Sequence, residues 1–350
     1  MLIIGCDFHT RYQQIAMMDQ ATGELVERRL EHENGEASAF YRSLPKPVRV
    51  GIEATGTLHW FERLLAELGH ELWIGDSAEI RARAVRQQKT DQRDAVHLLH
   101  LLLSNRFPRI WVPSPAERDL RQLLWHRHKL VCMRTLITNQ LHALAMSQGL
   151  CRKQKLFTKK GRAELGSLSL GPWASRRREE LGRMLDQLDP SILELDRAVL
   201  NEAKRREDAM RLMTHPGVGP VNALAFVLTI GPVTRFHRSK QVASYLGLNP
   251  SEHSSGGKQR LGAISKQGNT MVRWLLVEAA QIAVRMDPEL RQDFWRLKSR
   301  RGNAVAKVAI ARKLAVRLYW MLRSGADYAR LVRTQGSPGA TLVNASSSLG

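Results

Sequence analysis

The chain has 350 residues, 43% of them hydrophobic, which is enough for two or three domains with real cores and excludes wholesale disorder. Its 54 Lys/Arg and 33 Asp/Glu give a formal net charge of +21, which indicates a polyanionic partner. The three scattered cysteines fit neither a disulfide framework nor a zinc site, and they favour a reduced, intracellular setting.

No segment of the sequence indicates a membrane. The N-terminal residues, MLIIGCDFHT, lack the basic region of a signal peptide and reach an acidic residue early. The longest apolar run, Leu98–Leu103, is interrupted by His100 and is far too short to span a bilayer. We therefore expect a cytoplasmic protein with no membrane partner.

The charge is unevenly distributed along the chain. Residues 1–80 hold 7 Lys/Arg and 13 Asp/Glu, whereas the rest holds 47 Lys/Arg and 20 Asp/Glu. An acidic beginning followed by a strongly basic remainder predicts a carboxylate-bearing site attached to a surface that holds nucleic acid. The alternative, that the basic residues only solvate helix faces, accounts poorly for an excess this large.

The beginning of the chain has the pattern of an α/β domain. The predicted strands are Leu2–Asp7, Tyr12–Asp19, Leu25–Leu30, Val48–Glu53 and Leu72–Ile74, with helices at Glu36–Leu44 and Leu58–Leu68. Three consecutive strands, then helix, strand, helix and strand, are the layout of a ribonuclease-H-like domain. A Rossmann unit would alternate strand and helix from the start and would carry a glycine-rich first turn, which is absent.

From Asp91 onward the pattern becomes helical. Ala116–Leu150 predicts one or two long helices, Cys151–Trp173 a loop or linker, and Leu181–Met213 a charged helical run typical of a coiled-coil arm. The fold class is thus α/β followed by mostly all-α. The predicted boundaries are a catalytic domain at 1–108, a helical region at 109–205, a C-terminal helical domain at 206–333 and a disordered tail at 334–350.

Four acids have the placement of a metal site. Asp7 closes the first strand and Glu53 the fourth, while Asp91 and Asp94 share one face at the start of a helix. Four such carboxylates can hold one or two hard cations such as Mg²⁺, and a two-metal clamp suits phosphodiester chemistry. Taken singly, each acid is more often a turn or cap residue, and Asp91 could simply cap its helix. The set, in this strand order, favours the metal site.

The segment His215–Ala223, HPGVGPVNA, lies between two helical patterns and is a helix-hairpin-helix candidate. Gly217 and Gly219 would let backbone amides approach a DNA phosphate beside a helix N-terminus. An ordinary Pro-Gly turn between two helices explains the same residues, and the local sequence leaves both interpretations open.

A second glycine-rich segment, Ser254–Lys258 (SSGGK), combines hydroxyls, glycines and a lysine as a phosphate-binding loop does. A binding loop needs no catalytic serine, and a serine hydroxyl is a poor nucleophile unless a base or a metal activates it. Local chemistry therefore leaves the roles of Ser254 and Ser255 open. The candidate phosphate ligands are Gly256, Gly257, Lys258, Arg260 and Lys266.

The spacing of Asp7, IEATG and KTDQRDA resembles that of the Asp-Glu-Asp-Asp transposases of insertion sequences, a family that includes the Piv-type DNA invertases. Three further blocks extend the resemblance over most of the chain from Asp7 to about Leu276. A departure is VEAA at Val277–Ala280, where family members often carry a Gly-Ala-Arg-type segment. The blocks are Arg134–Leu141 (RTLITNQL), Pro216–Ala223 (PGVGPVNA) and Tyr245–Gly268 (YLGLNPSEHSSGGKQRLGAISKQG).

The resemblance implies a RuvC-like, ribonuclease-H-fold N-terminal domain whose four acids bind Mg²⁺, with Mn²⁺ as an alternative. It implies that Ser255, directly before the first glycine, attacks DNA and forms a phosphoserine link. It also implies double-stranded DNA partners (element ends and target), a structured guide or bridge RNA, and a dimer or tetramer in which the two domains form composite sites. The implied function is a transposase and site-specific DNA recombinase associated with a prokaryotic nucleoid.

Two other functions remain open from the sequence. A RuvC-like nuclease or resolvase would hydrolyse DNA with water, so Ser255→Ala would retain cleavage and Asp7→Ala would lose it. A non-catalytic nucleic-acid-binding protein with a decayed site would need no Mg²⁺ and would tolerate removal of the acids.

Overall fold

The structure is a computed structural model that describes residues 1–56, 58–83, 90–152, 155–252 and 260–335. The chain divides into two compact units, Met1–Val112 and Pro113–Gly350, and each is described by itself. The predicted boundary after residue 108, and the division of the following chain into regions 109–205 and 206–333, stay predictions.

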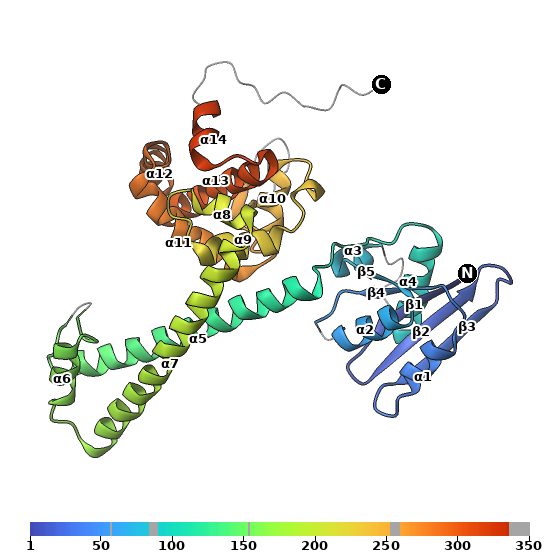
Figure 1. Ribbon diagram of the computed structural model, residues 1–350, viewed down its shortest axis with the longest axis horizontal. Coiled ribbons are helices and arrows are strands. Elements are labelled where there is room, and N and C mark those ends of the chain that lie inside the picture. The colour runs from blue at the N-terminus through green and yellow to red at the C-terminus, as the bar shows by residue number, and fades with distance from the viewer. Residues whose placement is uncertain (57, 84–89, 153–154, 253–259, 336–350) are drawn as a thin grey trace. The chain divides into compact units, whose positions relative to one another are not determined.

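The first unit is a five-stranded sheet with helices on both faces (Figure 1). The strand order is β3-β2-β1-β4-β5, in which β1, β2 and β3 are antiparallel neighbours while β4 and β5 run parallel to β1. The predicted order of strands and helices is confirmed. The elements are β1 (Leu2–Phe8), β2 (Tyr12–Asp19), β3 (Leu25–Glu31), α1 (Glu36–Ser43), β4 (Val48–Glu53), α2 (His59–Glu67), β5 (Glu71–Gly75), α3 (Ser77–Ala82) and α4 (Asp91–Leu103).

Alternation along the strands sends apolar side chains to both faces of this sheet. Ile4 and Cys6 of β1 are buried in the core beneath α1 and α2, whereas Ile3 is buried in the core beneath α3 and α4. Gly5 faces α4, and a Cβ added there would lie 2.9 Å from the Cα of Leu99. The backbone of α4 therefore rests directly on β1, at a position where only glycine leaves room.

The second unit begins with a pair of long helices, α5 (Pro115–Ser147) and α7 (Pro172–Lys204), which pack along each other (Figure 1). The prediction of one or two long helices at Ala116–Leu150 is confirmed, and the helix is a single one. The prediction of a loop over Cys151–Trp173 is wrong in part, because α6 (Lys159–Gly166) forms there. Its short, Lys- and Gly-rich sequence carries little helical signal, and Leu165 is instead buried against the two long helices.

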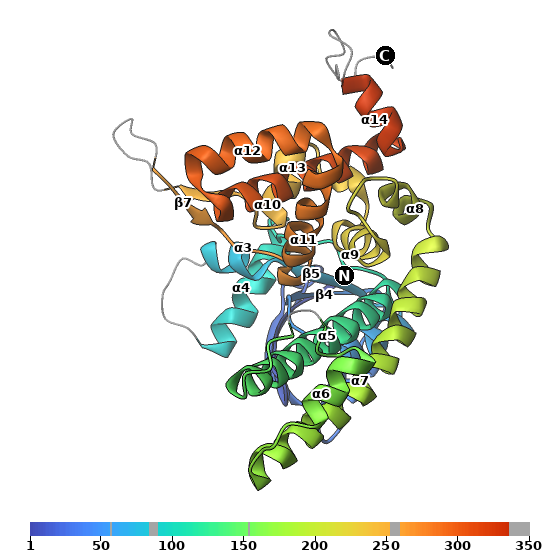
Figure 2. The same ribbon diagram turned by 90° about the vertical axis from the view of Figure 1, so that its left-hand side faces the viewer.

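The rest of the second unit is a helical bundle around α9, whose residues Ala223–Ile230 are all buried. Figure 2 shows α12 lying along α13, with α11 packed beside them. The elements are α8 (Glu207–Met213), α9 (Pro220–Ile230), the 3₁₀ turn η1 (Val233–Arg235), α10 (Ser239–Tyr245), β6 (Pro250–Glu252), β7 (Leu261–Ile264), α11 (Thr270–Met286), α12 (Pro288–Arg301), α13 (Asn303–Ser324) and α14 (Tyr328–Gln335).

Two details of this unit differ from the sequence prediction. The region predicted to be helical throughout also contains the antiparallel pair β6–β7, whose strands are too short to give an alternating pattern. Of the tail predicted to be disordered from Thr334, residues 334 and 335 complete α14, and residues 336–350 lie outside the described part of the chain.

Candidate active site

The ends of β1 and β4 bring two of the four predicted acids to the same face of the sheet. Cys6 and Ile52 pair in the parallel register, and both side chains are buried on the α1–α2 face. Because side chains alternate, Asp7 and Glu53, one residue further along each strand, point to the opposite face, which α4 covers. Glu53 is the last residue of β4, as predicted, whereas β1 continues one residue beyond Asp7 to Phe8. The two acids therefore lie at the ends of neighbouring strands.

Helix α4 supplies the other two acids from its first turn. Thr90 caps the helix, its side chain accepting a hydrogen bond from the Arg93 amide at 3.4 Å, so Asp91 is the first helical residue rather than the cap. Asp91 and Asp94 lie three residues apart and hence on one side of α4. Acids in the first turn are also favoured by the helix dipole.

Side-chain atoms from β1 and α4 meet around His9, which follows β1. The Nε2 atom of His9 lies 3.0 Å from Oδ2 of Asp7 and 3.5 Å from Oδ2 of Asp91. The hydroxyl of Tyr12 donates a hydrogen bond of 2.7 Å to the same Asp91 oxygen. Sequence segments that lie far apart therefore converge on one point at the edge of the sheet.

The donor atoms at this point fit a divalent cation. One atom each from Asp7, His9 and Asp91 lie within 4.8 Å of one another, which is close enough to share an ion. Two carboxylates and an imidazole are common ligands of divalent metals. Glu53 and Asp94 are not part of this group of atoms, so the described geometry brings two of the four predicted acids into ligating range and leaves the other two nearby.

The electrostatics of Asp7 show the crowding of negative charge. Burial raises the pKa of this carboxyl above its ordinary value, and Asp94 and Asp91 raise it further. His9 opposes this shift through its charge and its hydrogen bond. A cation between the carboxylates would relieve the repulsion and stabilise the charged forms.

Sequence reasoning missed His9 and Tyr12. A signal for His9 was present, because Asp7-x-His9 places both side chains on one face of an extended chain. Tyr12 carried no such signal, because its role depends on α4 reaching β2 from a distant part of the sequence.

In the second unit, the predicted glycine hairpin connects α8 to α9. Gly217 has φ +84°, and a Cβ there would lie 2.6 Å from the carbonyl oxygen of Ala279 and 2.8 Å from the amide of Ala283. Its backbone is therefore packed tightly against α11. Gly219, the N-cap of α9, has no atoms within 4 Å of its Cβ position. A shallow, open depression of about 530 Å³ adjoins the hairpin.

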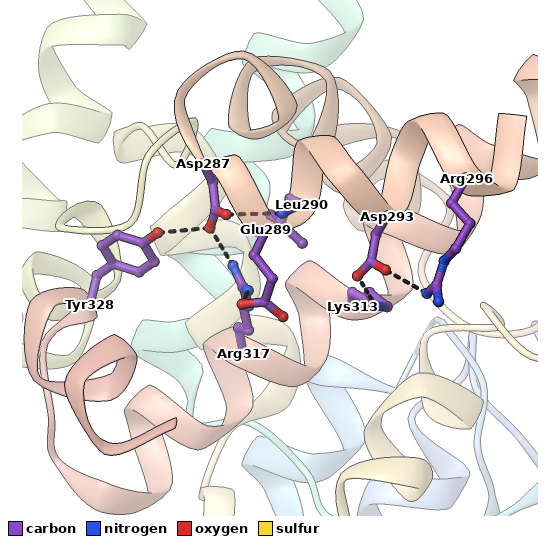
Figure 3. A network of polar contacts seen from close by, with 8 residues as sticks. All are labelled: Asp287, Glu289, Leu290, Asp293, Arg296, Lys313, Arg317 and Tyr328. Atoms are coloured by element: carbon purple, nitrogen blue, oxygen red, sulfur yellow. Dashed lines mark hydrogen bonds and ion pairs between the residues drawn. The ribbon is translucent and has the colours of Figure 1, made fainter. Parts of the chain in front are cut away.

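A polar network around the buried Asp287 connects α12, α13 and α14 (Figure 3). Asp287 accepts a hydrogen bond from the Leu290 amide at 2.9 Å, pairs with Arg317, and accepts a 2.7 Å bond from the Tyr328 hydroxyl. Burial alone would raise the pKa of Asp287, but these partners hold it below its ordinary value. The Tyr328 ring packs edge-on against the His215 ring, with the ring centroids 4.6 Å apart, and this contact connects the network to the hairpin.

The predicted serine loop can be described only at its ends. Ser254 and Ser255, with Gly256, Gly257 and Lys258, lie outside the described residues. The adjoining strands β6 and β7 pair through Glu252 and Leu261. Of the remaining predicted phosphate ligands, Arg260 directly precedes β7 and Lys266 follows it, and both are exposed.

Comparison with known proteins identifies the chain. Residues 4–147 match a family model described as a transposase, the DEDD domain of IS110 elements, and residues 209–295 match the transposase IS116/IS110/IS902 family. A probable family 20 transposase of Pseudomonas aeruginosa is 30% identical over 336 residues, covering 92% of this chain and 96% of the relative. The chain belongs to the IS116/IS110/IS902 family of transposases.

Two further relatives show that the likeness runs through both units of this transposase. The transposase for insertion sequence element IS1111A of Coxiella burnetii is 28% identical over 339 residues, covering 93% of this chain and 91% of the relative. The transposase for IS1328 of Yersinia enterocolitica is 27% identical over 329 residues, covering 91% and 96%. Among the described residues, no helix of the transposase is long and apolar enough to cross a membrane.

Proposed function

We propose that this insertion-sequence transposase cuts and rejoins DNA with a divalent cation held by Asp7, Glu53, Asp91 and Asp94, normally Mg²⁺ with Mn²⁺ as an alternative. The observation that carries the proposal is the convergence of Asp7 and Asp91, from β1 and α4, on one group of donor atoms. The five-stranded sheet, with acids at the ends of neighbouring parallel strands, supports the assignment of a RuvC-like, ribonuclease-H-type domain.

The residues of the site have distinct tasks in this proposal. A bound cation would polarise the scissile phosphate and stabilise the charge that develops on it. Asp7 and Glu53 would bind the cation from the sheet. Asp91 and Asp94 would bind it from α4. Tyr12 fixes the Asp91 carboxylate through its hydrogen bond. Because Gly5 allows the backbone of α4 to pack directly on β1, it sets the distance between the two pairs of acids in this proposal.

For strand transfer we propose Ser255 as the nucleophile. Its hydroxyl loses a proton, its oxygen bonds to the scissile phosphorus, and the deoxyribose oxygen leaves and takes up a proton. Rejoining reverses these changes with a new deoxyribose hydroxyl, so the phosphodiester energy is conserved in a phosphoserine link. The exposed cations Arg260 and Lys266, on either side of β7, support phosphate binding by this segment of the chain.

The partners that we propose are double-stranded DNA at the element ends and the target, a structured guide RNA, and further copies of this chain as a dimer or tetramer. The basic excess after residue 80, 47 Lys/Arg against 20 Asp/Glu, supports the binding of nucleic acid. No atom lies within 4 Å of the Cβ position of Gly219 at the N-terminus of α9, and this open space supports a contact of the hairpin with the DNA backbone.

One experiment tests the chemistry. The transposase is incubated with DNA of its element ends, RNA from the element and Mg²⁺, and the products are separated in SDS. We expect a protein–DNA adduct that Ser255→Ala abolishes and that the matched control, Ser254→Ala, retains. Cut ends without any adduct would indicate hydrolysis by water and refute the serine nucleophile. Cutting that survives Asp7→Asn and chelation would refute the metal site.

A further inference from the structure

His9 occupies a distinctive position among the acids of the first unit. Its Nε2 atom lies 3.0 Å from an oxygen of Asp7 and 3.5 Å from an oxygen of Asp91. These two carboxylates come from different elements, β1 and α4. The nitrogen therefore faces the space that a cation bridging the two carboxylates would share with it.

The imidazole is held in this orientation by its neighbours. Its ring stacks on Tyr12, with centroids 4.7 Å apart and planes inclined by 29°. The guanidinium of Arg29 covers the Tyr12 ring at 3.7 Å. The Tyr12 hydroxyl also binds Asp91, so one side chain positions both the imidazole and a carboxylate. Ligands held by supporting contacts of this kind are typical of metal sites.

We propose that His9 is a direct ligand of the divalent cation, through Nε2, alongside the carboxylates of Asp7 and Asp91. This inference rests on the proposed metal site and adds a nitrogen donor to its four carboxylates. If His9 served only to hold the Asp7 side chain in place, its hydrogen bond to Asp7 would be sufficient. Its second approach, to Asp91, is what places the nitrogen in the ligand group of both acids.

A nitrogen donor has a consequence for the choice of metal. Mg²⁺ prefers oxygen ligands and a near-ideal octahedral shell, whereas an imidazole favours transition metals over Mg²⁺. Mn²⁺ accepts carboxylates as Mg²⁺ does and lies at the weak end of the transition series. We therefore expect the transposase to bind Mn²⁺ more tightly than Mg²⁺, and we expect His9 to contribute most of this difference.

The test is Mn²⁺ binding followed by electron paramagnetic resonance, with no DNA and no activity measurement. In the full-length protein, the bound Mn²⁺ should show electron spin-echo modulation from a directly coordinated ¹⁴N nucleus. Labelling the protein with ¹⁵N-histidine should replace this signal with that of ¹⁵N. His9→Gln should abolish it and lower Mn²⁺ affinity on the order of 100-fold, with a smaller loss for Mg²⁺.

His59→Gln is the matched control, because this exposed histidine begins α2 in the same unit and is no member of the ligand group. It should leave the nitrogen signal and the Mn²⁺ affinity unchanged. If wild-type protein binds Mn²⁺ through Asp7, as shown by its loss in Asp7→Asn, yet lacks a histidine signal, the His9 inference is overturned and the proposed metal site stands. If wild-type protein binds no Mn²⁺ and no Mg²⁺, both are overturned.

Discussion

Gly5→Ala tests whether the close packing of α4 on β1 determines the relative positions of the four acids. A Cβ at this position would lie 2.9 Å from the Cα of Leu99, and closer still to the Ala95 carbonyl oxygen and the Leu99 amide. Carbon atoms in contact normally lie about 3.5–4.0 Å apart, so α4 must move away from the sheet by about 1 Å. The atoms in the way belong to the backbone, and no side-chain rotation can relieve the clash.

Two effects of Gly5→Ala follow. Overpacking of this kind costs about 1–3 kcal/mol, which lowers the melting temperature by several degrees in a domain of this size. Asp91 and Asp94 move with α4, and a misplacement of about 1 Å can reduce a catalytic rate on the order of 100-fold. We therefore expect a protein that still folds, and melts several degrees lower, but cuts element-end DNA roughly 100 times more slowly.

The assays are thermal unfolding of the full chain and the rate of DNA cutting at a temperature where the variant is folded. Gly51→Ala is the matched control on the neighbouring strand β4, since the three atoms nearest its Cβ position all belong to the Leu102 side chain, the closest being Cδ1 at 2.7 Å. That side chain can rotate, so we expect a smaller loss of stability and near-normal cutting. Normal cutting by Gly5→Ala, or an equal loss in both variants, would refute the reasoning.

Three further predictions concern charge and backbone. Burial raises the pKa of Asp7 above 3.8, so without metal the contribution of Asp7 to the free energy of unfolding should fall as pH rises from 3.8 through that raised pKa. Chemical denaturation in EDTA should show this fall as the difference between wild-type protein and Asp7→Asn, and a difference that does not change with pH would contradict it. Arg317→Met leaves the Asp287 carboxylate buried without its guanidinium partner and should lower the free energy of unfolding by about 3–5 kcal/mol in the same assay. An unchanged free energy of unfolding would show that this ion pair does not stabilise the fold. Gly217→Ala should lower the melting temperature, whereas Gly219→Ala should not; equal effects would contradict the packing described at Gly217.

Much of the first unit could be predicted because its strands carry clear apolar runs. The acids Asp7 and Glu53 stood out for the same reason, since each closes such a run. The alternation of side chains then fixed their common face. Sequence could not predict how closely α4 approaches the sheet, because this depends on the absence of side chains at Gly5 and Gly51.

Several features of the site and of the second unit could not be predicted, because they depend on tertiary packing rather than on local sequence. The hydrogen bond from Tyr12 to Asp91 requires β2 and α4 to lie together. The α6 helix and the β6–β7 pair are short, so packing rather than local pattern determines them. The local sequence left Gly217 open between a phosphate-binding glycine and an ordinary turn, and neither interpretation included its close packing against α11 at a positive φ.

The central claim is that carboxylates from β1 and α4 hold the cation that this transposase needs to cut DNA. The most direct test is cutting of element-end DNA by wild-type protein and by Asp7→Asn and Asp91→Asn, each in EDTA and in Mg²⁺ or Mn²⁺. The account predicts that wild-type protein cuts only with metal and that both folded variants fail to cut with either metal. Cutting by the wild type in EDTA, or by either variant at the wild-type rate, would contradict it.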